Sequence, residues 1–378
     1  MSLSGGISVT PVQDAAAMDA FLQLPWRLYA QDPCWVPQLL QEQRRFMDPR
    51  YGPFFEIGQA QYFLAWQNGR PVGRISAHVN RRHDDIHGPD TGFFGFFECE
   101  DNPPAAQALL EAAAAWLRSQ GKRLIQGPMN FSVYDEMGLL VEGFDTMPVI
   151  FQTHNPPYYE ELLTGWGLAK AMDWHAYKIT NREVDLEAME RRAHEILEKQ
   201  KLTFARYHPR EIPRRAREVY ELFNAAWESN WGHVPLTWRQ FEYFMTAVKP
   251  LLRPEYSFML LDKDRLAGFG IALPDINPVV KEIDGNLNLW GKLRLWYAAK
   301  YAPVRRIRCL VVGFNREHQG QAIHLAAILL GYVHLVKYTP CEMGDLSLIP
   351  ENIRHWIRPL RAFGAQRYKV FRVFQRNL

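Results

Sequence analysis

Hydrophobic and polar positions along the chain follow two periods, one typical of strands and one typical of helices. Alternating or continuous β-branched apolar runs predict strands at residues 7–12, 62–79, 92–99, 122–127, 169–179, 257–273, 307–312, 345–349 and 368–374. Apolar residues at three- and four-residue steps, with charged helix-favouring stretches, predict helices at residues 14–29, 104–119, 156–163, 183–201, 214–227, 323–333 and 351–362. The runs at residues 62–79 and 257–273 are each long enough for a hairpin, and Asn68-Gly69 is a strong turn signal in the first. The pattern predicts a mixed α/β protein.

The same order of elements occurs twice. The paired landmarks lie 195 or 197 positions apart and are Gly73 with Gly268, Asn155 with Asn352, and Gly167 with Gly364. Such a constant offset indicates a duplicated unit. We predict two domains, at residues 1–180 and 181–378, with the charged segment 183–201 linking them.

Composition narrows the class of protein. The chain has 378 residues, 47% hydrophobic content, a net charge of +3 and four scattered cysteines. A charge this small does not favour a nucleic-acid partner, and unpaired cysteines are typical of a reducing compartment. The start has no signal-peptide pattern, and no apolar run approaches 18 residues. We expect a cytoplasmic protein with no membrane partner, and no oligomeric state is predicted.

The segment from Ile307 to Val333 carries the most distinctive chemistry. A buried strand passes through the polar turn HQGQA into a helix. Gly320 permits close approach of the backbone, and the first-turn amides of a helix are unpaired donors at its positive end. The sequence predicts a pyrophosphate site at the amides of His318, Gln319, Gly320, Gln321 and Ala322. A plain strand-turn-helix corner is the alternative.

This segment resembles the signature of the GNAT acetyltransferase superfamily, Arg/Gln-x-x-Gly-x-Gly/Ala after a strand that ends in valine. Val312, Gly320 and Ala322 match it, whereas Glu317 replaces the Arg or Gln. The order of elements and the ending NIRHWIRPLRAFGAQRYKVFRVF also resemble the superfamily. Phrases such as DPCWVP, NPPYY and WESNWGHVP resemble a bacterial tandem GNAT-like family whose substrate is not established. The resemblance implies two tandem domains, each with a mixed, largely antiparallel, splayed sheet flanked by helices.

The resemblance also implies a co-substrate and site residues. Acetyl-CoA or another acyl-CoA would lie along the backbone of Val311, Val312 and Gly313, close to Asn352. The tyrosine that commonly acts as the acid is absent, because Pro359 and Leu360 occupy its place.

Candidates for the general base lie in WESNWGHVP, where Glu228 and His233 follow a predicted helix. A carboxylate or an imidazole can take the proton of an attacking amine. The alternative is a solvated glutamate beside an aromatic packing corner. Asp275 and Asn277, which follow the second hairpin, are further candidates or ordinary turn residues.

The two halves differ at the proposed phosphate turn. The first has EDNPPAAQALL, in which two prolines remove amide donors and no glycine is present. We expect the first half to be a degenerate copy and the second to hold acyl-CoA. His83 and His87 could bind a metal on a helix, but Gly88-Pro89 favours a loop there, so no metal site is predicted.

The sequence therefore predicts an acyl-CoA-dependent N-acyltransferase that acts on a small-molecule or peptide amine. Two alternatives stay open, a non-catalytic GNAT-fold ligand-binding protein and an aminoacyl-tRNA-dependent transferase. Neither a GxSxG elbow nor a Walker loop nor a GxGxxG motif is present, which argues against hydrolase, P-loop and Rossmann classes.

Overall fold

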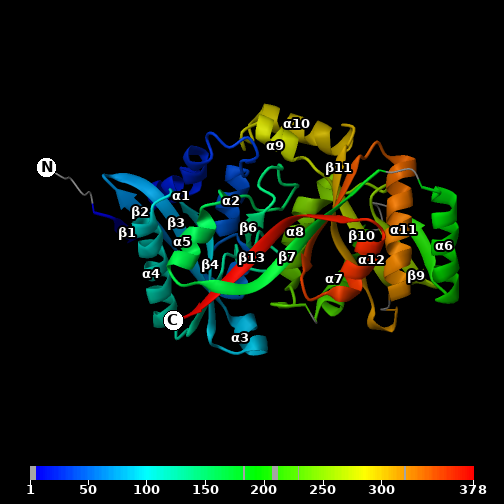
Figure 1. Cartoon of the computed structure of the whole chain (residues 1–378), viewed down its shortest axis with the longest axis horizontal. Helices are drawn as coiled ribbons and strands as arrows, with labels where there is room; N and C mark the ends of the chain where they lie inside the picture. Colours follow the sequence, from blue (N-terminus) through cyan, green and yellow to red (C-terminus); the bar gives the residue numbers. More distant parts are fainter. Residues whose placement is uncertain (1–5, 182–183, 207–211, 229, 319–320) are drawn as a thin grey trace. The chain divides into compact units, whose positions relative to one another are not determined.

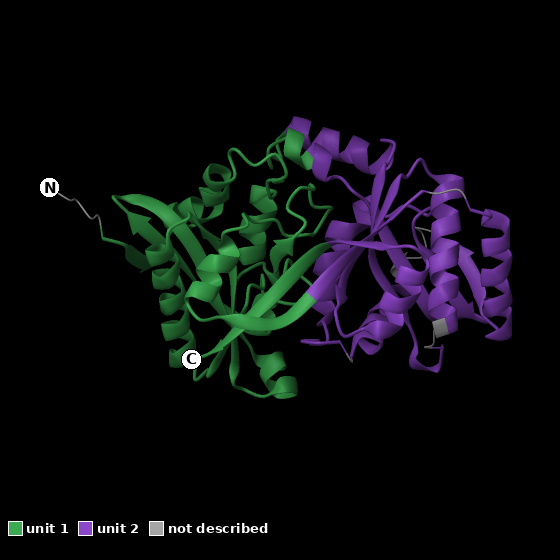
Figure 2. Ribbon diagram, in the orientation of Figure 1, with its two compact units in different colours: residues 1–173, 280–288, 369–378 green, residues 174–279, 289–368 purple. Residues whose placement is uncertain are grey.

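The computed structural model describes residues 6–181, 184–206, 212–228, 230–318 and 321–378 (Figure 1). The chain forms two compact units (Figure 2). Unit 1 comprises Met1–Asp173, Val280–Asn288 and Lys369–Leu378, and unit 2 comprises Trp174–Val279 and Leu289–Tyr368. Each unit contains its own set of strands and helices.

The sheet of unit 1 is largely antiparallel. Its strands are β1 (Ser8–Pro11), β2 (Gly58–Gln67), β3 (Arg70–Asn80), β4 (Thr91–Cys99), β5 (Leu124–Gly127) and β6 (Leu139–Glu142), completed by the end of β13 (Gln366–Asn377). Neighbours β1 to β4 pair antiparallel, and β4 pairs with β5 in parallel. The turn between β2 and β3 has positive φ at both Asn68 and Gly69, as the predicted two-residue hairpin requires.

The helices of unit 1 are α1 (Ala15–Leu28), α2 (Leu40–Met47), α3 (Arg81–His87), α4 (Pro103–Ser119) and α5 (Tyr159–Gly165), with a 3-10 turn at Pro53–Glu56. Asp14 caps α1 by accepting from the amide of Ala17, as its sequence position predicts. The loop predicted around His83 and His87 is wrong. Asn80 accepts from the amide of His83 and so starts α3 after the strand.

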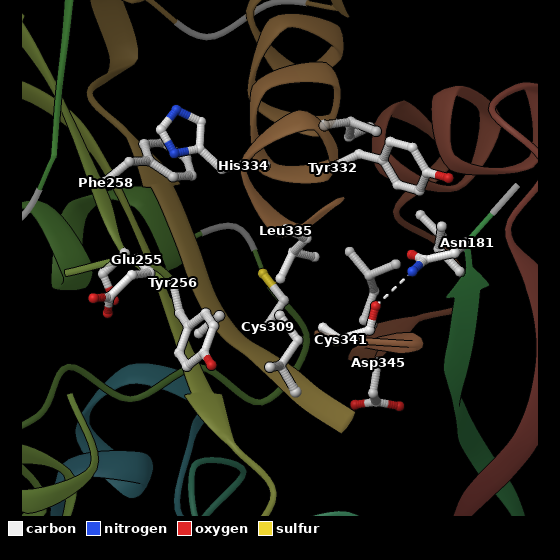
Figure 3. Close-up of a pocket in the computed structure, with 18 of the residues that line it drawn as sticks. Asn181, Glu255, Tyr256, Phe258, Cys309, Tyr332, His334, Leu335, Cys341 and Asp345 are labelled. Atoms are coloured by element: carbon white, nitrogen blue, oxygen red, sulfur yellow. Dashed lines mark hydrogen bonds between the residues drawn. The ribbon is translucent and has the colours of Figure 1, made fainter. Parts of the chain in front are cut away.

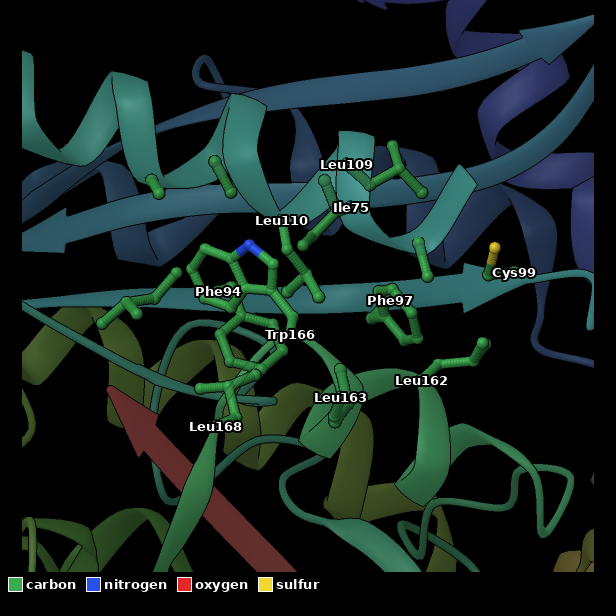
Figure 4. Close-up of a cluster of buried hydrophobic side chains, with 14 of the residues drawn as sticks. Ile75, Phe94, Phe97, Cys99, Leu109, Leu110, Leu162, Leu163, Trp166 and Leu168 are labelled. Atoms are coloured by element: carbon green, nitrogen blue, oxygen red, sulfur yellow. The ribbon is translucent and has the colours of Figure 1, made fainter. Parts of the chain in front are cut away.

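Apolar side chains fill both faces of the unit 1 sheet. On one face, Leu109 and Leu110 of α4 pack with Phe94 and Phe97 of β4, and Trp166 closes the cluster (Figure 4). On the other face, α1 and the first loops contribute a cluster of Phe21, Leu22, Met47, Phe54, Tyr62, Phe96 and Phe131. The sheet is therefore a rigid support for the loops at its edges.

The sheet of unit 2 repeats this plan. Its strands are β7 (Ala169–Thr180), β8 (Thr203–Arg206), β9 (Phe258–Asp262), β10 (Arg265–Pro274), β11 (Arg306–Phe314) and β12 (Met343–Pro350). Strands β8 to β11 pair antiparallel, β11 pairs with β12 in parallel, and β12 pairs antiparallel with the end of β7.

The helices of unit 2 are α6 (Leu186–Lys199), α7 (Ile212–Trp227), α8 (Trp238–Val248), α10 (Leu289–Lys300), α11 (Gln321–Tyr338) and α12 (Arg354–Ala362), with 3-10 turns at Lys249–Leu251 and Arg316–His318. The short α9 (Asn277–Glu282) begins in unit 2 and ends in unit 1. Buried residues of α6, α11 and α12 form one core with β9 to β12.

Strands β7 and β13 each pair with strands that come from the other half of the sequence. Residues 174–180 of β7 follow the first half but pair with β12 in unit 2. Residues 374–377 of β13 end the second half but pair with β5 in unit 1. Each sheet is thus completed by a strand from the opposite half of the chain.

Candidate functional site

Strands β11 and β12 of unit 2 separate before their ends. The two strands pair in parallel from Arg306 to Cys309 of β11. Beyond that point, among the described residues, β12 pairs only with β7, and β11 pairs only with β10. The edge of β11 from Leu310 to Phe314 therefore faces a gap in strand pairing.

A β-bulge lies where this gap begins. Ile271 pairs with Val311 and Ala272 with Cys309, so Leu310 is an extra residue on β11. A bulge bends its strand and breaks the regular ladder. The bulge thus redirects backbone groups of β11 where the strand leaves its parallel neighbour.

The predicted residues Val311, Val312 and Gly313 follow the bulge. Val311 and Gly313 are buried and Val312 is half-buried. A Cβ added at Gly313 would lie 3.2 Å from the Cβ of Ala226 in α7, so glycine permits close packing of helix and strand. These residues lie in the stretch of β11 that, within the described residues, has no pairing on the β12 side.

The turn after β11 uses one of the predicted amides itself. The amide of His318 donates to the carbonyl oxygen of Asn315 at 3.1 Å and to its Oδ1 at 3.2 Å. Gln319 and Gly320 lie outside the described residues. Gln321 and Ala322 are the first residues of α11, where backbone amides have no partner within a helix.

Glu228 and His233 lie in different surroundings. The Glu228 side chain is 61% exposed and forms an ion pair with Arg316, at the start of the turn. His233 is only 3% exposed, and its amide donates to the carbonyl of Asn230 at 3.1 Å. An ion pair therefore joins Glu228 to the segment that follows β11.

Three further residues that the sequence singled out are Asn352, Glu317 and Asp275. Asn352 is exposed just before α12, and its carbonyl accepts from the amide of Arg354 at 3.0 Å. Glu317 is also exposed. The side chain of Asp275 is only 1% exposed and pairs with Arg306 at 2.5 Å, which indicates a structural ion pair.

An apolar cavity lies between α11 and the sheet of unit 2 (Figure 3). Its lining includes Phe204, Tyr256, Phe258, Ala272, Ile307, Cys309, Ile328, Gly331, Tyr332, Leu335, Cys341 and Leu346. Cys309 and Leu346 are also the last parallel pair of β11 and β12, so the cavity borders the point where the strands part. A Cβ at Gly331 would meet nothing within 4 Å, so the helix leaves space on this side.

The cavity also has polar residues at its margins. Asp345 is fully buried and accepts a hydrogen bond from Tyr368 at 2.6 Å, with Arg308 3.9 Å away. Burial raises the pKa of the Cys309 thiol to about 12 and that of Cys341 to about 11. Both thiols are therefore protonated near neutrality and poor nucleophiles.

The corresponding gap in unit 1 is filled by the chain. β4 and β5 pair in parallel only from Thr91 to Phe93, and the amide of Met129 then donates to the carbonyl of Phe94 at 2.8 Å. The amide of Phe96 donates to the Asn130 side chain at 2.7 Å. The loop after β5 thus occupies the place that stays open beside β11.

Unit 1 instead contains a buried group of ionisable side chains that the sequence did not reveal as one site. Glu98 accepts from Tyr29 at 2.7 Å and from Tyr159 at 2.8 Å, and Arg74 lies 3.6 Å from its carboxylate. Burial raises the pKa of Glu98, against the opposing effect of Arg74. In the sequence, the one sign of this group is Glu98, a single acidic residue in the apolar run FFGFFEC.

Two further carboxylates extend this group. Burial raises the pKa of Glu136 to about 7, although Asn130 at 3.1 Å and Gln38 at 2.6 Å donate to its carboxylate. Burial also raises the pKa of Asp135 to about 7. Groups shifted in this way can exchange protons near neutral pH.

Among the described helices, not one combines the length and apolar character that a bilayer crossing needs.

No model of a protein family matches the chain. It is similar to "Bacterial ceramide synthase" of Caulobacter vibrioides (strain NA1000 / CB15N), with 29% identity over 394 residues that cover 100% of this chain and 99% of that protein. It is also similar to "Protein YghO" of Escherichia coli (strain K12), with 29% identity over 365 residues that cover 96% and 93% of the two proteins.

Solved structures show the same fold at low sequence identity. A tandem GNAT protein from the clavulanic acid biosynthesis pathway has a TM-score of 0.59 and 13% identity, and the match covers 98% of each chain. A GCN5-related N-acetyltransferase from Anabaena variabilis ATCC 29413 has a TM-score of 0.53 and 9% identity, with 98% of this chain and 72% of that chain covered. The resemblance seen in the sequence is confirmed, and the chain is a tandem GNAT-fold protein.

Proposed function

We propose that this protein is an acyl-CoA-dependent N-acyltransferase whose acyl-carrier site lies in unit 2. The observation that carries the proposal is the bulged edge of β11 beyond Cys309, which has no strand partner on the β12 side within the described residues. An exposed strand edge can pair with an extended ligand through its backbone groups. The pantetheine arm of CoA is extended and carries amides that suit such pairing.

The chain offers two kinds of backbone group to this co-substrate. Donors of Val311 to Gly313 would hold the arm and stabilise charge that develops on the thioester oxygen. The first amides of α11, at Gln321 and Ala322, would face the pyrophosphate. The amide of His318 already donates to Asn315, so it is not counted among these donors. Gln319 and Gly320 lie outside the described residues, and their amides belong to the proposal only.

Glu228 is the better-placed candidate for the base. Its carboxylate reaches solvent and pairs with Arg316, whereas His233 is buried. In the proposed reaction, the amine nitrogen forms a bond to the acyl carbon and the carbon–sulfur bond breaks. The base takes the amine proton, and the CoA thiolate leaves and is protonated by solvent.

The acceptor we propose is a long-chain amino alcohol, and the acyl group is a fatty acyl chain. The Caulobacter vibrioides relative is named a ceramide synthase, and a ceramide is the amide of these two components. The apolar cavity beneath α11 supports this choice, because it borders the point where β11 and β12 part. It would receive the acyl chain.

The test supplies fatty acyl-CoA and a long-chain amino alcohol, and it measures both free CoA thiol and the amide product by mass spectrometry. Gln321→Pro removes one amide from the first turn of α11, a position where proline fits a helix. We expect KM for acyl-CoA to rise about 10-fold or more, because one hydrogen bond to a charged group is lost.

The matched control is Ala15→Pro, at the exposed first position of α1, where the Asp14 cap is retained. It should leave KM unchanged. Equal KM values for the two variants would show that the pyrophosphate does not bind at the first turn of α11. Product formation without any acyl-CoA requirement would contradict the co-substrate.

A non-catalytic binding role is the second candidate. The engaged amide of His318 and the exposed Glu317 favour it, because both weaken an anion site. It predicts neither saturable binding of acyl-CoA nor thiol release with any amine tested.

A further inference from the structure

Helix α10 (Leu289–Lys300), labelled in Figure 1, carries large apolar side chains that are exposed to solvent. Of the nine large apolar side chains exposed among the described residues, six lie on α10 or directly after it. They are Leu289, Trp290, Leu293, Trp296, Tyr297 and Tyr301, with exposures from 50% to 77%. An apolar cluster of this kind marks an interaction surface.

The helix turns its small residues toward the protein. Gly291, Ala298 and Ala299 are the buried positions of α10. At about 100° per residue these lie on one side, and the six large apolar residues span an arc on the other. This is the reverse of an ordinary surface helix, which buries its large residues. Packing within unit 2 therefore does not explain the aromatic face.

The helix is held firmly in this orientation. Arg253 donates to the carbonyl of Ala299 at 2.7 Å and to that of Ala298 at 3.0 Å. These bonds satisfy carbonyls at the C-terminal end of the helix, which have no partner within it. Within the aromatic face, the rings of Trp296 and Tyr301 contact edge to face with centroids 5.3 Å apart.

Positive charge accompanies the apolar face. No Asp or Glu occurs from residue 285 to residue 316. Lys292 and Arg294 fall on the two sides of the apolar arc by helical position, and Lys300 lies 5.6 Å from the Trp296 ring at its end. Lysine and arginine beside tryptophan and leucine are typical of helices that lie in a membrane interface.

We propose that α10 is an interfacial helix that binds the surface of a bilayer containing anionic lipids. Trp290, Leu293 and Trp296 enter the boundary between headgroups and acyl chains, and the basic residues contact lipid phosphates. A second copy of the chain is a poorer occupant, because a symmetric contact would place the basic residues of α10 against each other.

This inference departs from the expectation of no membrane partner. That expectation considered only segments that could span a bilayer, and an interfacial helix needs none. The inference also does not rest on the proposed function, because lipid binding is measured without acyl-CoA or amine.

The experiment mixes the full chain with phosphatidylcholine vesicles, with and without phosphatidylglycerol, and measures the bound fraction by sedimentation. We expect binding that requires phosphatidylglycerol and falls at high salt. The triple variant Trp290→Ser, Leu293→Ser, Trp296→Ser and the double variant Lys292→Glu, Lys300→Glu should each bind about 10-fold more weakly. Circular dichroism checks that both stay folded.

The control variant is Tyr51→Ser with Ile86→Ser, which removes exposed apolar side chains from unit 1. It should bind vesicles as the unchanged chain does. Equal binding by the triple variant would overturn the proposal. So would a concentration-dependent dimer, seen by analytical ultracentrifugation without lipid and abolished by the triple variant, if vesicles are not bound.

Discussion

At the scale of single residues, burial changes the chemistry of several acids in ways the sequence does not display. Glu136 lies in a loop that reads as polar, yet its surroundings raise its pKa to about 7. Glu98 interrupts an apolar strand and is compensated by Arg74, Tyr29 and Tyr159. Removing one member of such a group leaves the others without compensation, so the group is expected to act as a unit.

The raised pKa of Glu136 predicts a pH-dependent stability. Its folded pKa of about 7 exceeds its ordinary value of 4.5, so the folded state holds the proton more tightly. This contribution is complete below pH 4.5 and is lost as the pH rises to about 7. Glu136→Gln should reduce the pH-dependent change in the free energy of unfolding by about 1–2 kcal/mol. One pKa unit is worth about 1.4 kcal/mol, and the figure is set below the full shift because solvent partly screens the side chain.

Denaturant unfolding at several pH values measures this effect. Glu161→Gln, at an exposed position of α5, is the control and should keep the slope. An unchanged slope in Glu136→Gln would mean that this carboxyl is ionised in the folded protein.

At the scale of elements, the position of α11 relative to β11 and β12 determines what the site can hold. His324 in the first turn of the helix contacts Phe314 at the end of β11, with ring centroids 5.1 Å apart, and later turns line the apolar cavity. One element thus serves both ends of the proposed acyl-carrier site. A Cβ at Gly331 would meet nothing within 4 Å, so the helix leaves room there.

Gly331 variants test the cavity. A helical glycine costs about 1 kcal/mol relative to alanine, so Gly331→Ala should stabilise the protein by up to that amount. Gly331→Phe should fill the cavity and shift the preferred acyl chain to a shorter one, because its side chain enters the free space. Product yields from acyl-CoAs of increasing chain length measure the shift.

Gly165→Phe is the matched control, because a Cβ at that exposed glycine of α5 also meets nothing within 4 Å. It should leave the chain-length preference unchanged. If both phenylalanine variants showed the same chain-length preference, the cavity would not be the site that binds the acyl chain.

At the scale of the whole molecule, the exchange of end strands distributes the stability of each unit over both halves of the sequence. Phe374 of β13 is 1% exposed in the core that surrounds α4 in unit 1. Tyr177 of β7 is 1% exposed in the core that surrounds α11 in unit 2. Each unit is therefore closed by a strand that the other half supplies.

This exchange predicts crossed effects of two core substitutions. Phe374→Ala should destabilise unit 1 by about 3–5 kcal/mol, and Tyr177→Ala should destabilise unit 2 similarly, because each removes a buried ring. Hydrogen exchange should quicken in α4 for the first variant and in α11 for the second. Faster exchange in α11 alone after Phe374→Ala would contradict the exchanged arrangement.

The sequence by itself determined the elements whose signals are local. The Asn68-Gly69 hairpin, the Asp14 cap and the duplicated order of elements follow from turn chemistry, capping and periodicity, which act between near neighbours. The GNAT fold followed from the resemblance of this order of elements, and of the segment after β11, to that superfamily. The division at residues 180 and 181 and the roles of Glu228, His233 and Asn352 stay predictions.

Only the tertiary structure decided features that depend on contacts distant in sequence. The filled gap of unit 1, the cavity beneath α11 and the buried group around Glu98 all require side chains from several elements to meet. The outward face of α10 was equally hidden, because small and large apolar residues both occur around this helix and its sequence does not tell which of them are buried. Burial by distant segments, and not local pattern, set the chemistry at each of these places.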